Sequence, residues 1–291
     1  MPTLIDYRRR IRSVRNTQQI TRAMKFIAAA RLRKAQEGVV SARPYAREIL
    51  RILRSAVARM ENPVHPLLER REEKRVLVIV LTGDRGLAGA FNTNVLRFAQ
   101  NFLREHQAEE ISVIAVGKKG RDVLRKKNYK LAGEFLNVSL NVEFHHAKEI
   151  AARVIELYTA HEVDAVYAIY NEFKSVIVQR LCSQKLLPVE PEILKSDDHT
   201  EAMALVDYIY EQPPAEIFTH LVPRYIDTEI FRILLESAAA EHGARMAAMD
   251  SATNNAGEMI TELTLEMNKI RQATITRELI EIVSGAAFTT G

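Results

Sequence analysis

The sequence predicts an α/β fold combined with a long α-helical antiparallel coiled coil, in which a smaller α/β domain is inserted between two long helices. Three observations predict it. Apolar residues recur every three or four positions near both ends of the chain, which is helix spacing. Short β-branched runs are concentrated between residues 74 and 195. Glycine and proline are scarce, with 11 and 9 residues, which disfavours an all-β fold with many turns.

The first long helix is predicted over residues 1–60. Its apolar face is carried by residues three or four apart, in the order Tyr7, Ile11, Val14, Ile20, Met24 and Ile27. Pro44 lacks a backbone donor, so we expect it to kink the helix or restart it locally. Pro63 and Pro66 predict the end of this block.

The second long helix is predicted over residues 210–288. After Pro213, Pro214 and Pro223 the chain contains no further proline. Between 50 and 70 helical residues, at about 1.5 Å each, make a rod of roughly 75–105 Å, which needs a partner along its length. Small residues between Ala238 and Ala248 let another helix approach closely. We therefore expect residues 210–288 to pair with residues 1–60 as an antiparallel coiled coil.

The charges of the two ends support this pairing. Residues 1–58 contain fourteen basic and three acidic side chains, whereas residues 213–291 contain six basic and eleven acidic ones. Opposite charges at the two ends indicate that they lie against each other or against different partners.

The middle of the chain, residues 74–195, predicts a small α/β domain. RVLVIVLT (75–82) and ISVIAVG (111–117) are apolar, β-branched runs, each followed by a helix-like stretch. AVYAIYNEF (165–173) and SVIVQRLC (175–182) predict a later pair of strands. Strands that alternate with helices indicate a largely parallel sheet.

Composition excludes several classes of protein. No run of eighteen apolar residues and no secretory h-region is present, so we expect a soluble intracellular protein without a membrane span. The single cysteine, Cys182, excludes an internal disulfide and a Cys-rich zinc site, and we expect it to be a small buried hydrophobe. His145 and His146 lack a third ligand at suitable spacing. No nucleophile accompanied by a base is recognisable, so we expect no active site and no cofactor.

Two segments leave an alternative open. LTGDRGLAGAFN (81–92) places Gly83, Gly86 and Gly89 after a strand and before a helix, but it lacks the Lys-Ser/Thr of a P-loop and the spacing of a dinucleotide site. It is either a structural turn or part of a nucleotide-binding enzyme. The basic residues between 8 and 34 are either solvated and partner-facing or bind nucleic acid, although no aromatic residues are interleaved for stacking.

Three passages together resemble the gamma subunits of F-type ATP synthases. They are IRSVRNTQQITRAMKFIAAARLRKAQ (11–36), LTGDRGLAGAFNTNV (81–95) and ARMAAMDSATNNAGEMITELTLEMNKIRQATITRELIEIVSGAAF (244–288). The resemblance implies N- and C-terminal shaft helices that flank an inserted Rossmann-like α/β domain. It also implies a non-catalytic central rotor, which couples ion flow through a membrane c ring to ATP synthesis or hydrolysis at the beta subunits and so regulates both ATPase activity and ion flow.

The partners that the resemblance implies are the alpha and beta subunits of a hexameric ring, an epsilon subunit and the c ring. Nucleic acid is not among them. The expected location is the cytoplasmic side of the cell (inner) membrane, as a peripheral protein. The chloroplast type of gamma subunit carries a cysteine pair for redox control, and since only Cys182 is present here, we expect no such thiol switch.

The resemblance also implies contact residues, each of which could instead be an ordinary exposed helix residue. Contacts with the beta subunit are expected from six residues: Met24, Lys25, Arg245, Arg271, Gln272 and Thr276. Contacts with the c ring are expected from Tyr208, Tyr210 and Glu211. The apolar tail from Ile280 to Phe288 is expected in an apolar sleeve of the ring, although such a tail can also simply fray.

Overall fold

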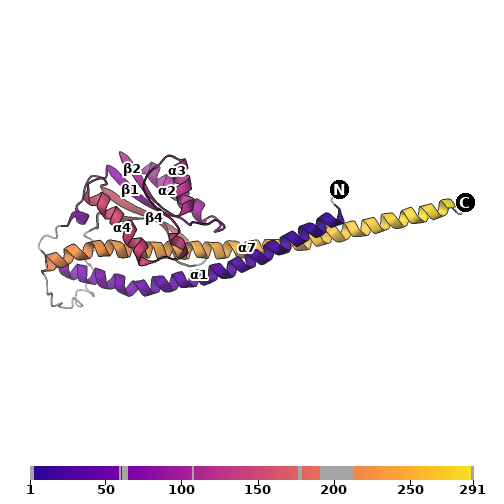
Figure 1. Ribbon diagram of the computed structural model, residues 1–291, viewed down its shortest axis with the longest axis horizontal. Coiled ribbons are helices and arrows are strands. Elements are labelled where there is room, and N and C mark those ends of the chain that lie inside the picture. The colour runs from indigo at the N-terminus through magenta and orange to yellow at the C-terminus, as the bar shows by residue number, and fades with distance from the viewer. Residues whose placement is uncertain are drawn as a thin grey trace. The chain divides into compact units, whose positions relative to one another are not determined.

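The computed structural model describes residues 3–58, 60, 65–106, 108–175, 179–190 and 213–289. Two long helices, α1 (Leu4–Ala58) and α7 (Pro214–Thr289), flank a five-stranded sheet in the sequence (Figure 1). The predicted fold class, an α/β domain inserted between two long pairing helices, is confirmed. Packing divides the chain into two compact units: unit 1, residues 1–28 and 246–291, and unit 2, residues 29–245.

The sheet of unit 2 has the strand order β3-β2-β1-β4-β5. Its strands are β1 (Arg75–Leu81), β2 (Glu110–Val116), β3 (Lys130–Phe135), β4 (Ala165–Phe173) and β5 (Gln179–Leu187). The first four are parallel, and β5 pairs with β4 in the antiparallel direction. The connections contain α2 (Phe91–Glu105), α3 (Lys118–Lys126), α4 (Phe144–Thr159) and two 3₁₀ turns, η1 (Pro66–Leu68) and η2 (Val138–Leu140).

Strand β1 contributes side chains to two hydrophobic cores, one on each face of the sheet. Alternate residues point to opposite faces of a strand. Val76, Val78 and Val80 pack with α2 and α3 on one face, whereas Leu77, Ile79 and Leu81 pack with α4, α1 and α7 on the other. Burial on both faces explains why RVLVIVL is continuously apolar rather than alternating.

Unit 1 is an antiparallel pair of helices. Thr21 and Thr253 share a hydroxyl hydrogen bond of 2.8 Å, and Gln18 donates to the Thr253 carbonyl. Near the start of α1, Tyr7 is hydrogen-bonded to Glu266. Residue numbers therefore fall along α7 as they rise along α1, which makes the pair antiparallel. Past the first turn of α1, α7 continues alone (Figure 1).

Both long helices pass through a proline. α1 does not restart at Pro44, and α7 begins at Pro214 and continues through Pro223. Pro223 cannot donate to the carbonyl of Thr219, four residues earlier. The ring of His65 hydrogen-bonds the Thr219 backbone in its place, while His65 Nδ1 accepts from the Leu67 amide. A side chain from outside the helix thus supplies the hydrogen bond to the Thr219 carbonyl that Pro223 cannot make.

Two details of the sheet differ from the prediction. The edge strand β3 was missed because KLAGEF is mostly polar and partly exposed, which hides the strand signal. The last strand begins at Gln179 and ends at Leu187, later than the predicted 175–182. Its end lies against the buried end of β4, and burial there was not visible in its polar sequence.

Candidate functional site

Two of the expected contact residues lie on α1 in unit 1. Met24 is partly buried. The ammonium of Lys25 forms an ion pair of 2.5 Å with Asp250 of α7. Both side chains remain partly exposed, at 36% and 47%, so the pair meets solvent. An acidic group of a partner would therefore compete with Asp250 for Lys25.

Three other expected contact residues lie on the part of α7 that continues past α1. Arg271, Gln272 and Thr276 are exposed, and the Thr276 hydroxyl donates to the Gln272 carbonyl inside the helix. From 271 to 283 only Thr274 is partly buried. Gln272 and Arg271 therefore present their side chains to the surroundings.

The same stretch of α7 exposes large apolar side chains. Ile275, Leu279 and Ile280 are 49%, 56% and 60% exposed, and Ile282 and Val283 are each 67% exposed. Exposed apolar surface of this density marks an interaction site in a soluble protein. This end of α7 is therefore suited to an apolar partner surface.

Arg245 occupies a different setting, inside unit 2. Its side chain is 10% exposed and forms a 2.6 Å ion pair with Glu241, whose side chain is 4% exposed. Its guanidinium also approaches the Gly86 carbonyl and the ring of His242. The structure gives Arg245 a role within the chain, and its contact with a beta subunit stays a prediction.

The glycine-rich segment 81–92 packs against this buried ion pair. A Cβ on Gly83 would lie 2.6 Å from the Glu241 carboxylate, so only glycine lets the loop approach. The Gly83 amide donates to the Asn92 side chain. A carboxylate therefore occupies the space beside Gly83 and would repel a phosphate, which favours the structural turn over nucleotide binding.

Asp84 ties the same loop to two neighbouring elements. Its carboxylate accepts from the Lys118 amide at 3.0 Å, from the Asn137 amide at 2.9 Å and from the Ser139 hydroxyl at 3.2 Å. The side chain is buried, and these three donors stabilise it there. The segment thus joins the carboxyl edge of the sheet to the residues around α7.

His242 is a neutral member of this network. Burial, together with the charges of Arg245 and Arg31, lowers its pKa to about 4. Its ring also hydrogen-bonds the Ser139 backbone. Because Nδ1 faces the Arg245 guanidinium at 3.2 Å, the proton lies on Nε2.

The sequence analysis did not predict a role for Glu241, His242 or Asp84. Each lies in a stretch whose pattern predicted only a helix or a turn. The spacing of Glu241 and Arg245, four residues apart, is the one signal that could have suggested their pairing. The expected c-ring residues Tyr208, Tyr210 and Glu211 lie outside the described residues.

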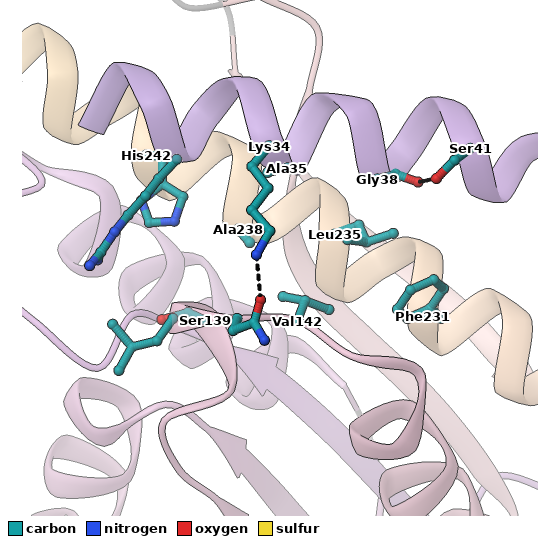
Figure 2. Close-up of a pocket in the computed structure, with 13 residues that line it drawn as sticks. Lys34, Ala35, Gly38, Ser41, Ser139, Val142, Phe231, Leu235, Ala238 and His242 are labelled. Atoms are coloured by element: carbon teal, nitrogen blue, oxygen red, sulfur yellow. Dashed lines mark hydrogen bonds between the residues drawn. The ribbon is translucent and has the colours of Figure 1, made fainter. Parts of the chain in front are cut away.

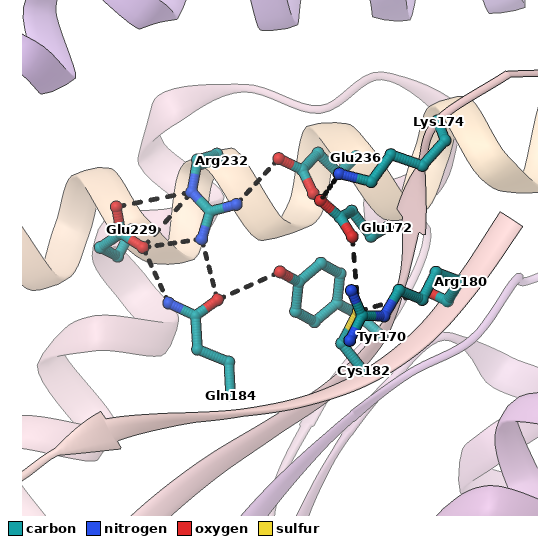
Figure 3. Close-up of polar contacts among 9 residues, drawn as sticks. All are labelled: Tyr170, Glu172, Lys174, Arg180, Cys182, Gln184, Glu229, Arg232 and Glu236. Atoms are coloured by element: carbon teal, nitrogen blue, oxygen red, sulfur yellow. Dashed lines mark hydrogen bonds and ion pairs between the residues drawn. The ribbon is translucent and has the colours of Figure 1, made fainter.

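A second, partly buried network joins β4 and β5 to α7 in unit 2. Arg232 binds the carboxylates of Glu229 and Glu236, and it also donates to the Gln184 side chain (Figure 3). Cys182 is half-buried beside it, and burial raises the pKa of its thiol. Burial likewise raises the pKa of Glu236.

Searches for other kinds of site in the described residues gave two results. None of the described helices combines the length and apolar composition that crossing a bilayer requires. Over the same residues, His, Cys, Asp and Glu side chains do not gather in groups of three suited to a metal ion.

Known proteins share this fold. A chain of the Euglena gracilis mitochondrial ATP synthase, from a structure of its OSCP/F1/c-ring, superposes with a TM-score of 0.67 at 21% identity, over 98% of this chain and 93% of that one. A second structure, of the rotor from the same organism, gives 0.61 at 20% identity, over 94% and 98%. The chain therefore shares its fold with these two chains.

Sequence relatives identify the family. The family model described as ATP synthase matches residues 3–288. The ATP synthase gamma chain of Solibacter usitatus (strain Ellin6076) is 52% identical over 99% of both chains. That of Pelotomaculum thermopropionicum (strain DSM 13744 / JCM 10971 / SI) is 49% identical, again over 99% of both. The chain belongs to the ATP synthase gamma chain family.

Proposed function

We propose that the chain is the central rotor stalk of an F-type ATP synthase. It couples ion flow through a membrane c ring to ATP synthesis or hydrolysis at the beta subunits of an alpha/beta hexamer. By its rotation it regulates both ATPase activity and ion flow, and it carries no catalytic site of its own. The observation that carries this proposal is the end of α7, where large apolar side chains are exposed along a single helix.

The surface of unit 1 suits a rotor because its two helices differ. Arg8, Arg9, Arg12 and Arg15 are exposed on α1, whereas α7 carries Glu258, Glu262 and Glu266 in the paired region. A shaft that presents unlike faces to identical subunits can place them in different states in turn. The family membership and the stalk fold both agree with this role.

In this proposal the exposed end of α7 lies in an apolar sleeve of the hexamer. Arg271, Gln272 and Thr276 bond to the beta subunit just below that sleeve, and Met24 and Lys25 meet its acidic moving loop. The exposed side chains at 271, 272 and 276 support these contacts. Arg245 is proposed to contact the beta subunit as well, while it holds the glycine-rich loop against α7 within unit 2.

The other end of the rotor meets the c ring and the epsilon subunit. Tyr208, Tyr210 and Glu211 are proposed to contact the polar loops of the c ring. The chain is then a peripheral protein on the cytoplasmic side of the cell membrane.

A pull-down from the host cells tests the proposal. A tagged copy of the chain, purified from detergent-solubilised membranes, is expected to bring down alpha, beta, epsilon and c subunits in stable proportion. A matched variant that ends at Leu279 removes the exposed apolar tail and is expected to retain epsilon but to lose most of alpha and beta. Recovery of the full-length chain without alpha and beta would contradict the proposal.

A further inference from the structure

A pocket of about 160 Å³ lies in unit 2 between α1, α7 and the loop after η2 (Figure 2). Its apolar side consists of α7 residues, among them Leu235 and Ala238. Lys34 reaches from α1 toward the loop, where its ammonium donates to the Asn141 side chain at 3.0 Å. The pocket is thus closed on one side by a polar bridge.

The charged side chains that line this pocket are all basic, and the ring of His242 is neutral. Arg31 and Lys34 line it, and none of the side chains that line it is a carboxylate. Within the described part of the chain, neither cation forms an ion pair with an acidic side chain. Glu143 is bonded to Asn141 but does not line the pocket.

The lowered pKa of His242 is consistent with a positive potential in this pocket. His242 lines the pocket, and the charges of Arg31 and Arg245 help to keep its ring neutral. Guanidinium and ammonium groups that line a pocket without a carboxylate counter-ion bind oxyanions through charge-assisted hydrogen bonds, and arginine does so bidentately.

We propose that this pocket binds a small anion of the phosphate class, inorganic phosphate or pyrophosphate, between Arg31 and Lys34. Its volume is below the roughly 300–1,000 Å³ of pockets for drug-sized ligands, so a whole nucleotide is too large. Arg31 and Lys34 are not among the expected subunit contacts of the rotor, and the site does not depend on the proposed function.

Calorimetric titration of the full-length chain with phosphate and with pyrophosphate tests the proposal, at constant ionic strength. Saturable binding is expected for the wild type. Arg31→Gln removes a bidentate donor and is expected to weaken binding roughly tenfold or more. Lys34→Gln is expected to weaken it several-fold, while Arg31→Lys retains part of it.

Arg33→Gln is the matched control. Arg33 lies on the same helix and carries the same charge, but it pairs with Glu37 and does not line the pocket. The affinity of the Arg33→Gln variant for phosphate is expected to equal that of the wild type. Ring signals of His242, assigned by their loss in His242→Gln, are expected to shift on phosphate addition in the wild type and in Arg33→Gln.

Three outcomes would overturn the site. The first is the absence of saturable binding by the wild type. The second is equal weakening by Arg33→Gln and Arg31→Gln, which would indicate diffuse attraction to a basic helix. The third is binding that leaves the His242 signals unmoved. Circular dichroism of each variant separates a loss of binding from a loss of fold.

Discussion

At the residue scale, the structure explains side chains by their environment rather than by their type. His242 and His65 are both buried, and burial lowers the pKa of each. Each ring donates to a backbone group that the helices cannot satisfy alone. From the sequence these histidines carried no signal, because a neutral buried imidazole needs only local partners that are distant in the chain.

The pKa of His242 predicts a pH dependence of stability. Its folded value, about 4, lies below the ordinary 6.5, so the unfolded chain binds the proton more tightly. The stabilisation is complete above pH 6.5 and is lost as the pH falls toward 4. Between pH 7 and pH 5 the free energy of unfolding is expected to fall by about 2 kcal/mol from this group.

Urea unfolding of the wild type and of His242→Gln at the two pH values measures this effect. Glutamine keeps a donor for the Ser139 backbone but does not titrate. The loss between pH 7 and pH 5 is therefore expected to be smaller in the variant by about 2 kcal/mol. An identical loss in both proteins would show that folding leaves the pKa of His242 unchanged, which would contradict its burial as a neutral ring.

At the scale of elements, periodicity was sufficient for the helices and for the central strands. Continuous apolar runs predicted β1 and β2 because these strands are buried on both faces. The edge strand β3 escaped because its sequence is polar. Pro44 was expected to kink or restart the first helix, and α1 does not restart there. α7 continues through Pro223, where His65 supplies one missing hydrogen bond.

The candidate site was predictable only in part. Exposure of Arg271, Gln272 and Thr276 agrees with their expected position on a helix surface. The ion pair of Glu241 with Arg245 depends on how the loop after β1 meets α7, a long-range contact that spacing along the chain does not encode. Gly83 likewise lies close to the Glu241 carboxylate, which favours a structural role for this glycine.

The ion pair between Glu241 and Arg245 predicts that a single and a double variant differ strongly in stability. Arg245→Met leaves the buried Glu241 carboxylate without its counter-ion and is expected to destabilise the chain by about 3–5 kcal/mol. Glu241→Gln combined with Arg245→Met removes both charges and is expected to recover most of that loss. Chemical unfolding curves measure both, and equal destabilisation of the two variants would contradict a charge-based role.

At the scale of the whole molecule, the chain combines a helical pair that exposes apolar and charged side chains with a sheet domain whose polar groups are held internally. Unit 1 presents the surface that a surrounding assembly can bind. Unit 2 holds its loops against α7 through Asp84 and the Glu241–Arg245 pair. This division agrees with the proposed role of a rotor within a larger assembly.

Charge reversal at Arg271 tests the division in the assembled complex. Arg271→Glu reverses the charge at the proposed bond of Arg271 to the beta subunit and is expected to reduce ATP-driven ion pumping roughly tenfold, since hydrogen bonds to charged groups contribute about 1.5–3 kcal/mol. The stability of the isolated chain is expected to change by less than about 0.5 kcal/mol, because the residue is exposed.

Arg97→Glu is the control for that experiment. Arg97 is exposed on α2, in unit 2, and carries the same charge change. Pumping by membranes that contain it is expected to match the wild type. Unimpaired pumping by Arg271→Glu, or unfolding of the isolated variant, would contradict the placement of Arg271 at a coupling contact.

The most direct measurement of the central claim follows rotation in single complexes. A bead is attached to a cysteine introduced at Arg97, with Cys182 replaced by serine, and the alpha/beta hexamer is fixed to a surface. The account predicts stepwise rotation of the bead in one direction, dependent on ATP. Beads that stay still while the same complexes hydrolyse ATP would contradict it.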